Sequence, residues 1–234
     1  VDPRMTMRYK VLPKTTIKAA AGMFSNHPEP REVNDEYGNP NLVLEHAAHF
    51  SAGVEQKILK ALSLDVQGYF IWRYDTVVPT KQVQVTDDGI RRLNFVNEGS
   101  GYSAGMELIL KHDVTKHFYG WLAYTLSMSK AQRKPDGDYV FFAFDQTHIL
   151  TLVASYRIGW GWEAGARFRL VSGRPDTPVI GSIYDNDIGK YTRLNGDLFS
   201  DRLPVFHQLD IRVEKTWIFE LWRLSVYLDI QNIY

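Results

Sequence analysis

A hairpin pattern repeated along the chain restricts the fold more than any other feature of this sequence. In its clearest copy, Leu209, Ile211 and Val213 alternate with polar or charged residues. After a short turn near 219–222, residues 224–231 alternate in the same way. Successive side chains of a strand point to opposite faces, so such a hairpin has one apolar face and one charged face. The repeat therefore predicts an all-β, antiparallel sheet.

Five such hairpins follow one another, joined alternately by short turns and long polar loops. The predicted strand pairs are 5–10 with 16–23, 50–57 with 64–73, 102–111 with 122–126, 150–156 with 162–170, and 208–214 with 224–231. The predicted loops are 25–44, 78–93 (with an Asp87-Asp88 turn before Gly89), 130–139 and 172–205. Short turns at one end and long loops at the other are typical of an antiparallel transmembrane β-barrel in a bacterial outer membrane. A soluble β-sandwich is the alternative, because it shows similar alternation.

Composition narrows the class of protein further. Lys plus Arg and Asp plus Glu number 27 each, so no net charge favours nucleic acid as a partner. The chain has no cysteine, which excludes disulfides and thiolate metal sites, and no run of about 18–20 apolar residues that could form a membrane helix. Aromatic residues make up 13%, and Trp160, Trp162, Trp217 and Trp222 lie beside the predicted short turns, where interfacial belts occur.

The two ends of the chain suggest a part of a larger protein. Val1-Asp2-Pro3-Arg4 has neither the basic nor the apolar region of a signal peptide, although an outer-membrane protein must be exported. Tyr234 ends the sequence directly after a strand-like run. We therefore expect a mature or partial chain.

Several stretches resemble the C-terminal barrel half of TonB-dependent outer-membrane receptors. The segment 37–42 (YGNPNL), followed by Glu45 and by 49–55 (HFSAGVE), is similar to a strand entry of that family. So are 97–107 (NEGSGYSAGME), 203–213 (LPVFHQLDIRV) and 228–234 (LDIQNIY). Each motif is weak alone, but their order and spacing extend over almost the whole chain.

The resemblance implies a plugged barrel of roughly 22 strands. Residues 1–234 would be a partial outer-membrane β-barrel domain of about ten strands, from which the plug domain and the final strands are absent. The implied function is energy-coupled uptake of a scarce nutrient such as a metal chelate. The implied partners are outer-membrane lipid, the protein's own plug domain, and a TonB-type energy-coupling protein that acts through the missing N-terminal region.

A non-transporting alternative stays open. The same barrel would then serve as a scaffold subunit or a surface receptor in a larger assembly, with other outer-membrane subunits as partners. A plug domain with a TonB-contacting segment upstream would favour transport, and its absence would favour a scaffold.

Candidate site residues fall into two sets. Ligand contacts are expected in the loops and at the rim of the lumen: Arg73, Arg167, Arg169, Arg174, Tyr184, Asp185, Tyr191 and Arg193. These residues combine aromatic platforms with hydrogen-bonding and charged groups on loops, where binding residues concentrate. A structural role in balancing lumen charge is expected for Glu55, Glu107, Asp210 and Arg212.

Enzymatic and metal sites are not predicted. His46 and His49 are three residues apart on a strand and so face opposite sides, and His112 and His117 flank a turn without a carboxylate-rich surrounding. No phosphate-binding loop or dinucleotide motif occurs. The Asp87-Asp88 pair with His207 and Asp210 could mimic the rim site of a barrel hydrolase, but Asp87-Asp88 fits a turn better. We expect no catalytic residue, no metal and no cofactor.

Overall fold

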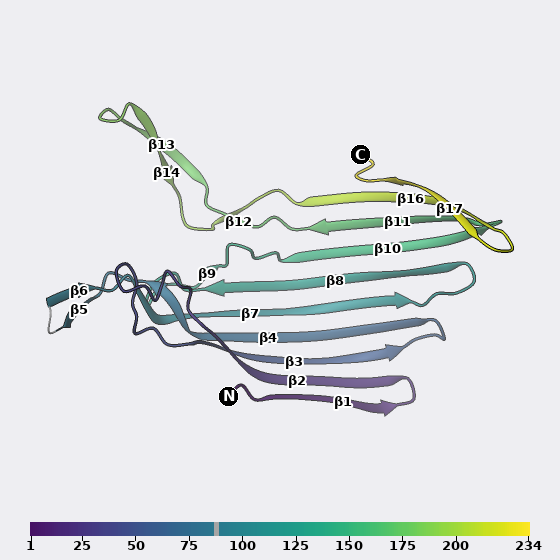
Figure 1. Ribbon diagram of the computed structural model, residues 1–234, viewed down its shortest axis with the longest axis horizontal. Coiled ribbons are helices and arrows are strands. Elements are labelled where there is room, and N and C mark those ends of the chain that lie inside the picture. The colour runs from purple at the N-terminus through teal and green to yellow at the C-terminus, as the bar shows by residue number, and fades with distance from the viewer. Residues whose placement is uncertain (87–88) are drawn as a thin grey trace.

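Ten long antiparallel strands form one sheet in the computed structural model, which describes residues 1–86 and 89–234 (Figure 1). Strands that follow one another in this series along the chain are also neighbours in the sheet. The prediction of about ten strands in five hairpins is confirmed. The predicted Asp87-Asp88 turn lies outside the described residues. Within the described part of the chain, no helix has the length and apolar character needed to cross a membrane.

The ten strands range from eight to eighteen residues. They are β1 (Arg4–Leu12), β2 (Thr15–Asn26), β3 (Glu45–Lys57), β4 (Leu62–Pro79), β7 (Phe95–His112), β8 (Phe118–Ala131), β10 (His148–Gly159), β11 (Trp162–Val171), β16 (Phe206–Ile218) and β17 (Arg223–Ile230). The two-residue strand β9 (Val140–Phe141) pairs with β8 at its loop end. Among the described residues, β1 and β17 each pair on one side only, so the sheet has two free edges.

Strand register places the alternating residues on two consistent faces. On one face, Gln67 lies opposite Glu107, which lies opposite Thr125. One residue along, Val66, Leu108 and Tyr124 are paired in the same way on the other face. We call these the charged face and the apolar face.

The apolar face is not covered by any part of the described chain. Among the described residues, the buried apolar side chains are few, namely Val78, Val96, Val171 and Pro175, whereas Phe50, Leu152 and many others are exposed. A sheet with so little packed interior cannot be stabilised by its own core, because apolar surface must be removed from water to contribute free energy. An apolar medium such as lipid satisfies this requirement along the whole face.

The two ends of the sheet differ as the sequence predicts. The short connections between β1 and β2, β3 and β4, β7 and β8, β10 and β11, and β16 and β17 all lie at one end, which we call the turn end (Figure 1). The long connections lie at the opposite end, which we call the loop end.

Two of the long loops contain strands that the sequence analysis did not predict. The loop after β4 contains the pair β5 (Val83–Thr86) and β6 (Gly89–Arg92). The loop after β11 contains β13 (Val179–Asp185) and β14 (Lys190–Asn195), above a short pair of β12 (Pro175–Asp176) and β15 (Asp201–Arg202). The expectation of plain loops here was wrong. These strands are short and rich in polar residues, so their alternation is weak in the sequence.

Asparagine side chains attach the first long loop to β7. Buried Asn39 donates its side-chain amide to the carbonyl of Phe95 (3.0 Å) and accepts from the backbone N–H of Asn41 (3.0 Å). Asn97 accepts from the N–H of Val43 (2.9 Å) and donates to the carbonyl of Val43 (3.1 Å). An amide side chain can donate and accept at once, so each Asn replaces a missing backbone pair. Two of the motifs that carry the family resemblance therefore hold one loop in place.

Position 105, in the same motif as Asn97, requires glycine for a steric reason. A Cβ atom at this position would lie 2.6 Å from the carbonyl oxygen of Leu126 and 2.6 Å from the hydroxyl of Tyr69, its cross-strand neighbour. Glycine is therefore required because the Tyr69 ring and the backbone of β8 occupy the space beside it.

We expect Gly105→Ala to lower the free energy of unfolding by about 1–3 kcal/mol, as overpacking typically does. The backbone carbonyl of Leu126 cannot move aside as a flexible side chain would. The measurement is urea unfolding of the full-length protein in lipid vesicles. Gly165→Ala is the matched control, since its Cβ would make ordinary contacts of 3.5 Å or more. Equal effects at the two glycines would contradict the close contact with Tyr69.

Candidate functional site

The predicted ligand contacts lie in two separate places. Arg73 on β4 and Arg167 and Arg169 on β11 are on the charged face, and Arg174 lies three residues after the end of β11. The other four, Tyr184 and Asp185 on β13 and Tyr191 and Arg193 on β14, belong to a hairpin that extends away from the sheet (Figure 1). The structure therefore does not bring the eight residues into one site.

Arg73 is half-buried on the charged face near the loop end. One guanidinium nitrogen donates to the hydroxyls of Ser103 (3.1 Å) and Ser129 (3.0 Å), which face each other across β7 and β8. The guanidinium lies 5.7 Å from the ring of Phe142 and lines a cavity of about 380 Å³. Among the described residues, no carboxylate lies within 4 Å of Arg73. Its hydrogen-bond partners are thus neutral, and the carboxylate of Glu45 lines the same cavity without forming an ion pair with it.

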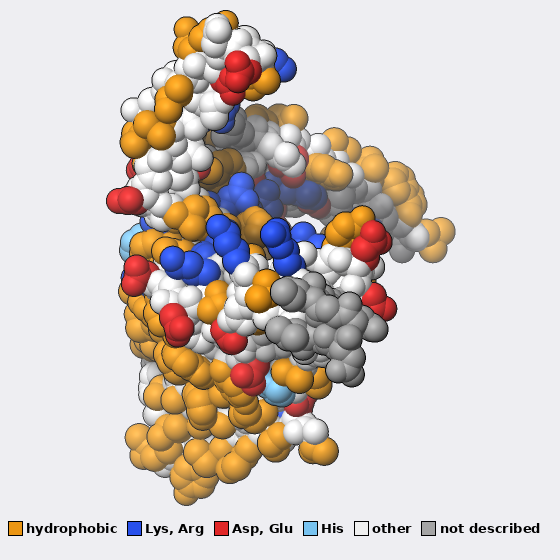
Figure 2. All heavy atoms as spheres, turned by 90° about the vertical axis from the view of Figure 1, so that its left-hand side faces the viewer, with side chains coloured by type: hydrophobic (Ala, Val, Ile, Leu, Met, Phe, Trp, Pro, Cys, Tyr) orange, Lys and Arg blue, Asp and Glu red, His pale blue; other side chains and the backbone are white. Residues whose placement is uncertain are grey.

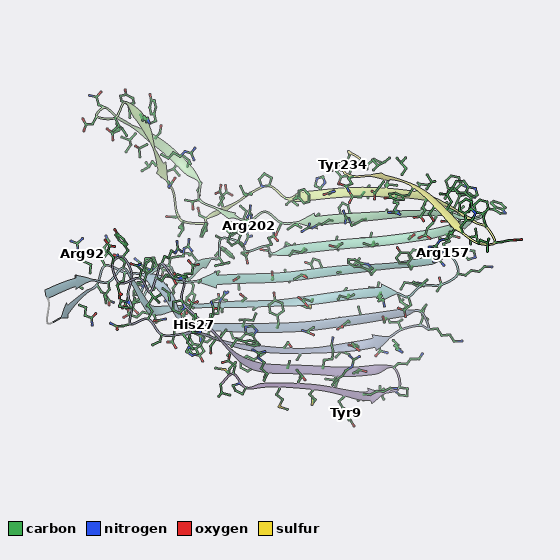
Figure 3. The ribbon with its side chains drawn as sticks, in the orientation of Figure 1. Tyr9, His27, Arg92, Arg157, Arg202 and Tyr234 are labelled. Carbon is green, nitrogen blue, oxygen red and sulfur yellow. The ribbon has the colours of Figure 1, made fainter. Side chains whose placement is uncertain are left out.

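A buried ion pair next to Arg73 was missed by the sequence analysis. The Asp145 side chain is 1% exposed and accepts from the Arg202 guanidinium at 2.6 Å. The other carboxylate oxygen accepts from the backbone N–H of Ser129 at 2.7 Å. Arg202 also donates to the carbonyl of Gly173 (3.0 Å), so it joins three loop-end segments. Figure 3 shows Arg202 at the loop end, where the long β11–β16 connection leaves the sheet, opposite Arg157 at the turn end.

Three phenylalanines between β8 and β10 each lie beside an arginine from another segment. Arg202 lies 4.7 Å from the ring centre of Phe141, Arg73 lies 5.7 Å from Phe142, and Arg174 lies 5.7 Å from Phe144. Such contacts orient a guanidinium while leaving its N–H groups available for another acceptor. We call this set the rim cluster; its members are Arg73, Phe141, Phe142, Phe144, Asp145, Arg174 and Arg202.

The rim cluster lies at the loop end of the sheet. Viewed from that end, Lys and Arg side chains gather in the hollow of the molecule, with hydrophobic side chains along its lower and outer sides (Figure 2). The sequence signal for the cluster was the apolar run from Phe141 to Phe144, which ends in Asp145 within an otherwise polar connection.

Arg167, unlike Arg73, forms an ion pair with a carboxylate on the neighbouring strand β16. Two of its nitrogens donate to one carboxylate oxygen of buried Asp210, at 2.9 and 2.6 Å. The other oxygen accepts from the side chain of Gln208 (2.7 Å) and the backbone N–H of Asn232 (3.0 Å). Arg169 lies nearer the loop end and lines a smaller cavity of about 250 Å³ that Arg174 also lines.

The four residues expected to balance lumen charge all lie on the charged face. Glu55 pairs with Arg8 and lies 3.4 Å from Lys18, and Arg212 donates to Glu214 at 2.8 Å. Glu107 is exposed beside Gln67 and has no ion pair within 4 Å among the described residues. The structural role of the set stays a prediction.

The β13–β14 hairpin carries its predicted residues on an exposed surface. The rings of Tyr184 and Tyr191 lie opposite each other with centres 5.1 Å apart. Asp185 accepts from the backbone N–H groups of Asp187 (2.9 Å) and Ile188 (3.4 Å), so it stabilises the turn of the hairpin. Their role as ligand contacts remains a prediction.

Histidines are separated as the strand geometry predicts. His46 lies 3.2 Å from Asp75, while His49 lies against the Phe24 ring on the charged face. His112 and His117 contact backbone carbonyls of different segments. In the described part of the chain, no group of three or more His, Asp or Glu residues could hold a metal ion.

A continuous apolar face, a charged face, short turns at one end and long loops at the other define the wall of an outer-membrane β-barrel. The family model for the TonB-dependent receptor-like β-barrel matches residues 1–233. The chain belongs to this family, whose members are receptors and transporters of the bacterial outer membrane rather than enzymes.

Solved structures share the fold of this chain. The outer-membrane transporter YddB from Escherichia coli has a TM-score of 0.70 at 12% identity, and the match covers 99% of this chain and 36% of that one. The FrpB iron transporter from Neisseria meningitidis (F3-3 variant) gives 0.68 at 15% identity, covering 99% and 34%. The ferripyoverdine receptor of Pseudomonas aeruginosa, bound to ferripyoverdine, gives 0.66 at 12% identity, covering 99% and 29%.

This chain thus spans about a third of the length of these structures. A comparison with curated proteins gave no match.

Proposed function

We propose that this chain is part of the barrel wall of a receptor that takes up a scarce nutrient, such as a metal chelate, across the outer membrane. The observation that carries the proposal is the rim cluster, where Arg73 faces a cavity with its charge held by two serine hydroxyls. A guanidinium in this setting suits carboxylate or other oxygen-rich anionic groups, which are common in metal chelators. The similar structures named as an iron transporter and a ferripyoverdine receptor support the same ligand class.

We further propose that residues 1–234 are a partial barrel domain. The free edges of β1 and β17 need partners, because an unpaired strand edge cannot remain exposed in lipid. Additional strands of the same protein would close the barrel around a plug domain. Capture at the loop end, followed by movement of the plug driven by a TonB-type protein, would then carry the ligand along the charged face.

The test is uptake of radiolabelled ferric chelates by cells that express the full-length protein in place of their own receptors. The proposal expects saturable uptake of one chelate that stops when a protonophore removes the proton-motive force. Specific binding without uptake in energised cells would contradict transport.

The Arg73→Gln substitution is expected to weaken chelate binding by about tenfold or more, because a charge-assisted hydrogen bond is lost. Arg73→Lys should restore only part of the affinity, since an ammonium lacks the planar fork of the guanidinium. Equilibrium binding to the full-length protein in detergent is the measurement.

Arg193→Gln is the control for this prediction, because Arg193 lies on the separate β13–β14 hairpin. A larger loss at Arg193 than at Arg73 would move the ligand site from the rim cluster to the hairpin.

A further inference from the structure

One corner of the turn end has an unusual concentration of tryptophan. Four of the six tryptophans in the chain lie there: Trp160, Trp162, Trp217 and Trp222. They come from the turn after β10, the start of β11, the end of β16 and the turn after it, and the Trp222 ring stacks on Phe219 at 4.0 Å. Together with Lys215 we call them the tryptophan corner. An ordinary aromatic belt is spread around a barrel, whereas the turns after β1 and β3 contain no tryptophan.

Lys215 places a positive charge on the apolar face within this corner. It lies opposite Trp162 and Val226, in the row that also contains Val213. Its ammonium is 5.4 Å from the ring centre of Trp162 and 5.5 Å from that of Trp217. It donates to the carbonyl of Trp160, and in the described chain no carboxylate lies within 4 Å of it. An ammonium has three protons, so hydrogen bonds to a further acceptor remain available.

The turn end as a whole carries an excess of positive charge, as Lys215 does. The five turns, each with four flanking residues on either side, contain ten Lys and Arg residues but only five Asp and Glu residues. One of the five, Asp113, accepts a hydrogen bond from Lys111 at 2.9 Å, which lowers the pKa of this carboxyl. The four long loops have the opposite balance, with ten basic and fourteen acidic residues. The chain as a whole has no net charge, so the basic excess belongs to the turn end and the acidic excess to the long loops.

We propose that Lys215 and the tryptophan corner form a binding site for the phosphate group of an anionic glycerophospholipid in the inner leaflet of the outer membrane. Short turns of such barrels face the periplasm, which places this corner at the level of the inner headgroups. The indole rings occupy the interface between headgroup and acyl chain, and the ammonium between them pairs with a phosphate. The basic excess of the turn end as a whole favours a lipid with net negative charge over a zwitterionic one. This site does not depend on which nutrient the receptor binds.

The test is native mass spectrometry of the full-length protein in detergent, titrated with phosphatidylglycerol or with phosphatidylethanolamine. We expect tighter binding of phosphatidylglycerol, and about a fivefold loss of that affinity in Lys215→Gln, as one basic residue near a headgroup typically contributes. Lys215→Arg should bind as the unaltered protein does. Lys130→Gln, which removes a lysine from the same face at the loop end, should leave the affinity unchanged.

Two results would overturn the proposal. Equal affinity for the two lipids would show that the tryptophan corner anchors the protein in the interface without selecting an anionic headgroup. Equal phosphatidylglycerol affinity of Lys215→Gln and the unaltered protein would show that the lysine does not bind the phosphate. Quenching of tryptophan fluorescence by brominated phosphatidylglycerol gives a second readout, and it should fall in Lys215→Gln relative to Lys215→Arg.

Discussion

Replacing Asp145 by Asn is expected to destabilise the loop end by about 3 kcal/mol, because the substitution leaves the Arg202 guanidinium without its carboxylate partner. The Asp145 side chain is 1% exposed and that of Arg202 is 30% exposed, so water can compensate only part of the loss. Ser129 loses a charged acceptor for its backbone N–H at the same time. The effect should be local, since this ion pair connects the β8–β10 connection to the long connection after β11.

Hydrogen exchange followed by mass spectrometry on the full-length protein measures this effect. Faster exchange is expected at Ser129 and in residues 172–205, with strands β1 to β3 unchanged. Asp113→Asn is the matched control, because the Lys111–Asp113 pair is exposed and such pairs contribute at most about 1 kcal/mol. The double variant Asp145→Asn with Arg202→Met should recover stability relative to Asp145→Asn, because no guanidinium is left without a partner and the amide oxygen can still accept from the Ser129 N–H. Unchanged exchange in Asp145→Asn would show that the pair does not hold the loops together.

Replacing Leu122 by Arg is expected to cost about 2–4 kcal/mol of folding free energy in a lipid bilayer. Leu122 lies on the apolar face between Leu110 and Leu152, four residues from the turn-end start of β8. An arginine there must place its charge in hydrocarbon, which is the most costly position on a barrel surface.

Thr125→Arg is the control on the same strand. Thr125 lies on the charged face opposite Glu107, so the new guanidinium gains a carboxylate neighbour. Chemical unfolding of the full-length protein in vesicles should show little change for this variant. Similar costs at Leu122 and Thr125 would contradict the assignment of the two faces.

Local patterns in the sequence predicted the strands and their faces well. Alternation in 208–214 or 102–111 follows directly from the two-residue period of a strand. This period is a local property of the backbone and does not depend on the tertiary structure. The short hairpins β5–β6 and β13–β14 were missed, because four to seven residues with many polar side chains do not show a clear period.

Contacts between distant segments could not be predicted in this way. Asp145 and Arg202 are 57 residues apart, and nothing in either neighbourhood indicates the other. Arg73 and Arg167 have the same chemical character in the sequence, yet one faces a cavity and the other is paired with Asp210. Which arginine keeps an available charge depends on cross-strand neighbours, and these are set by register.

The sequence by itself determined an antiparallel sheet with an apolar face that contacts lipid and a charged face on the opposite side. It could do so because side-chain alternation and loop length are local properties of the chain. The order of its motifs also indicated the receptor family. Only the tertiary structure decided that Gly105 makes room for Tyr69, that Arg73 belongs to the rim cluster, and that Tyr184 and Arg193 lie on a separate hairpin. Those features depend on long-range strand pairing and on the folding of the loops, which bring together residues that no local pattern connects.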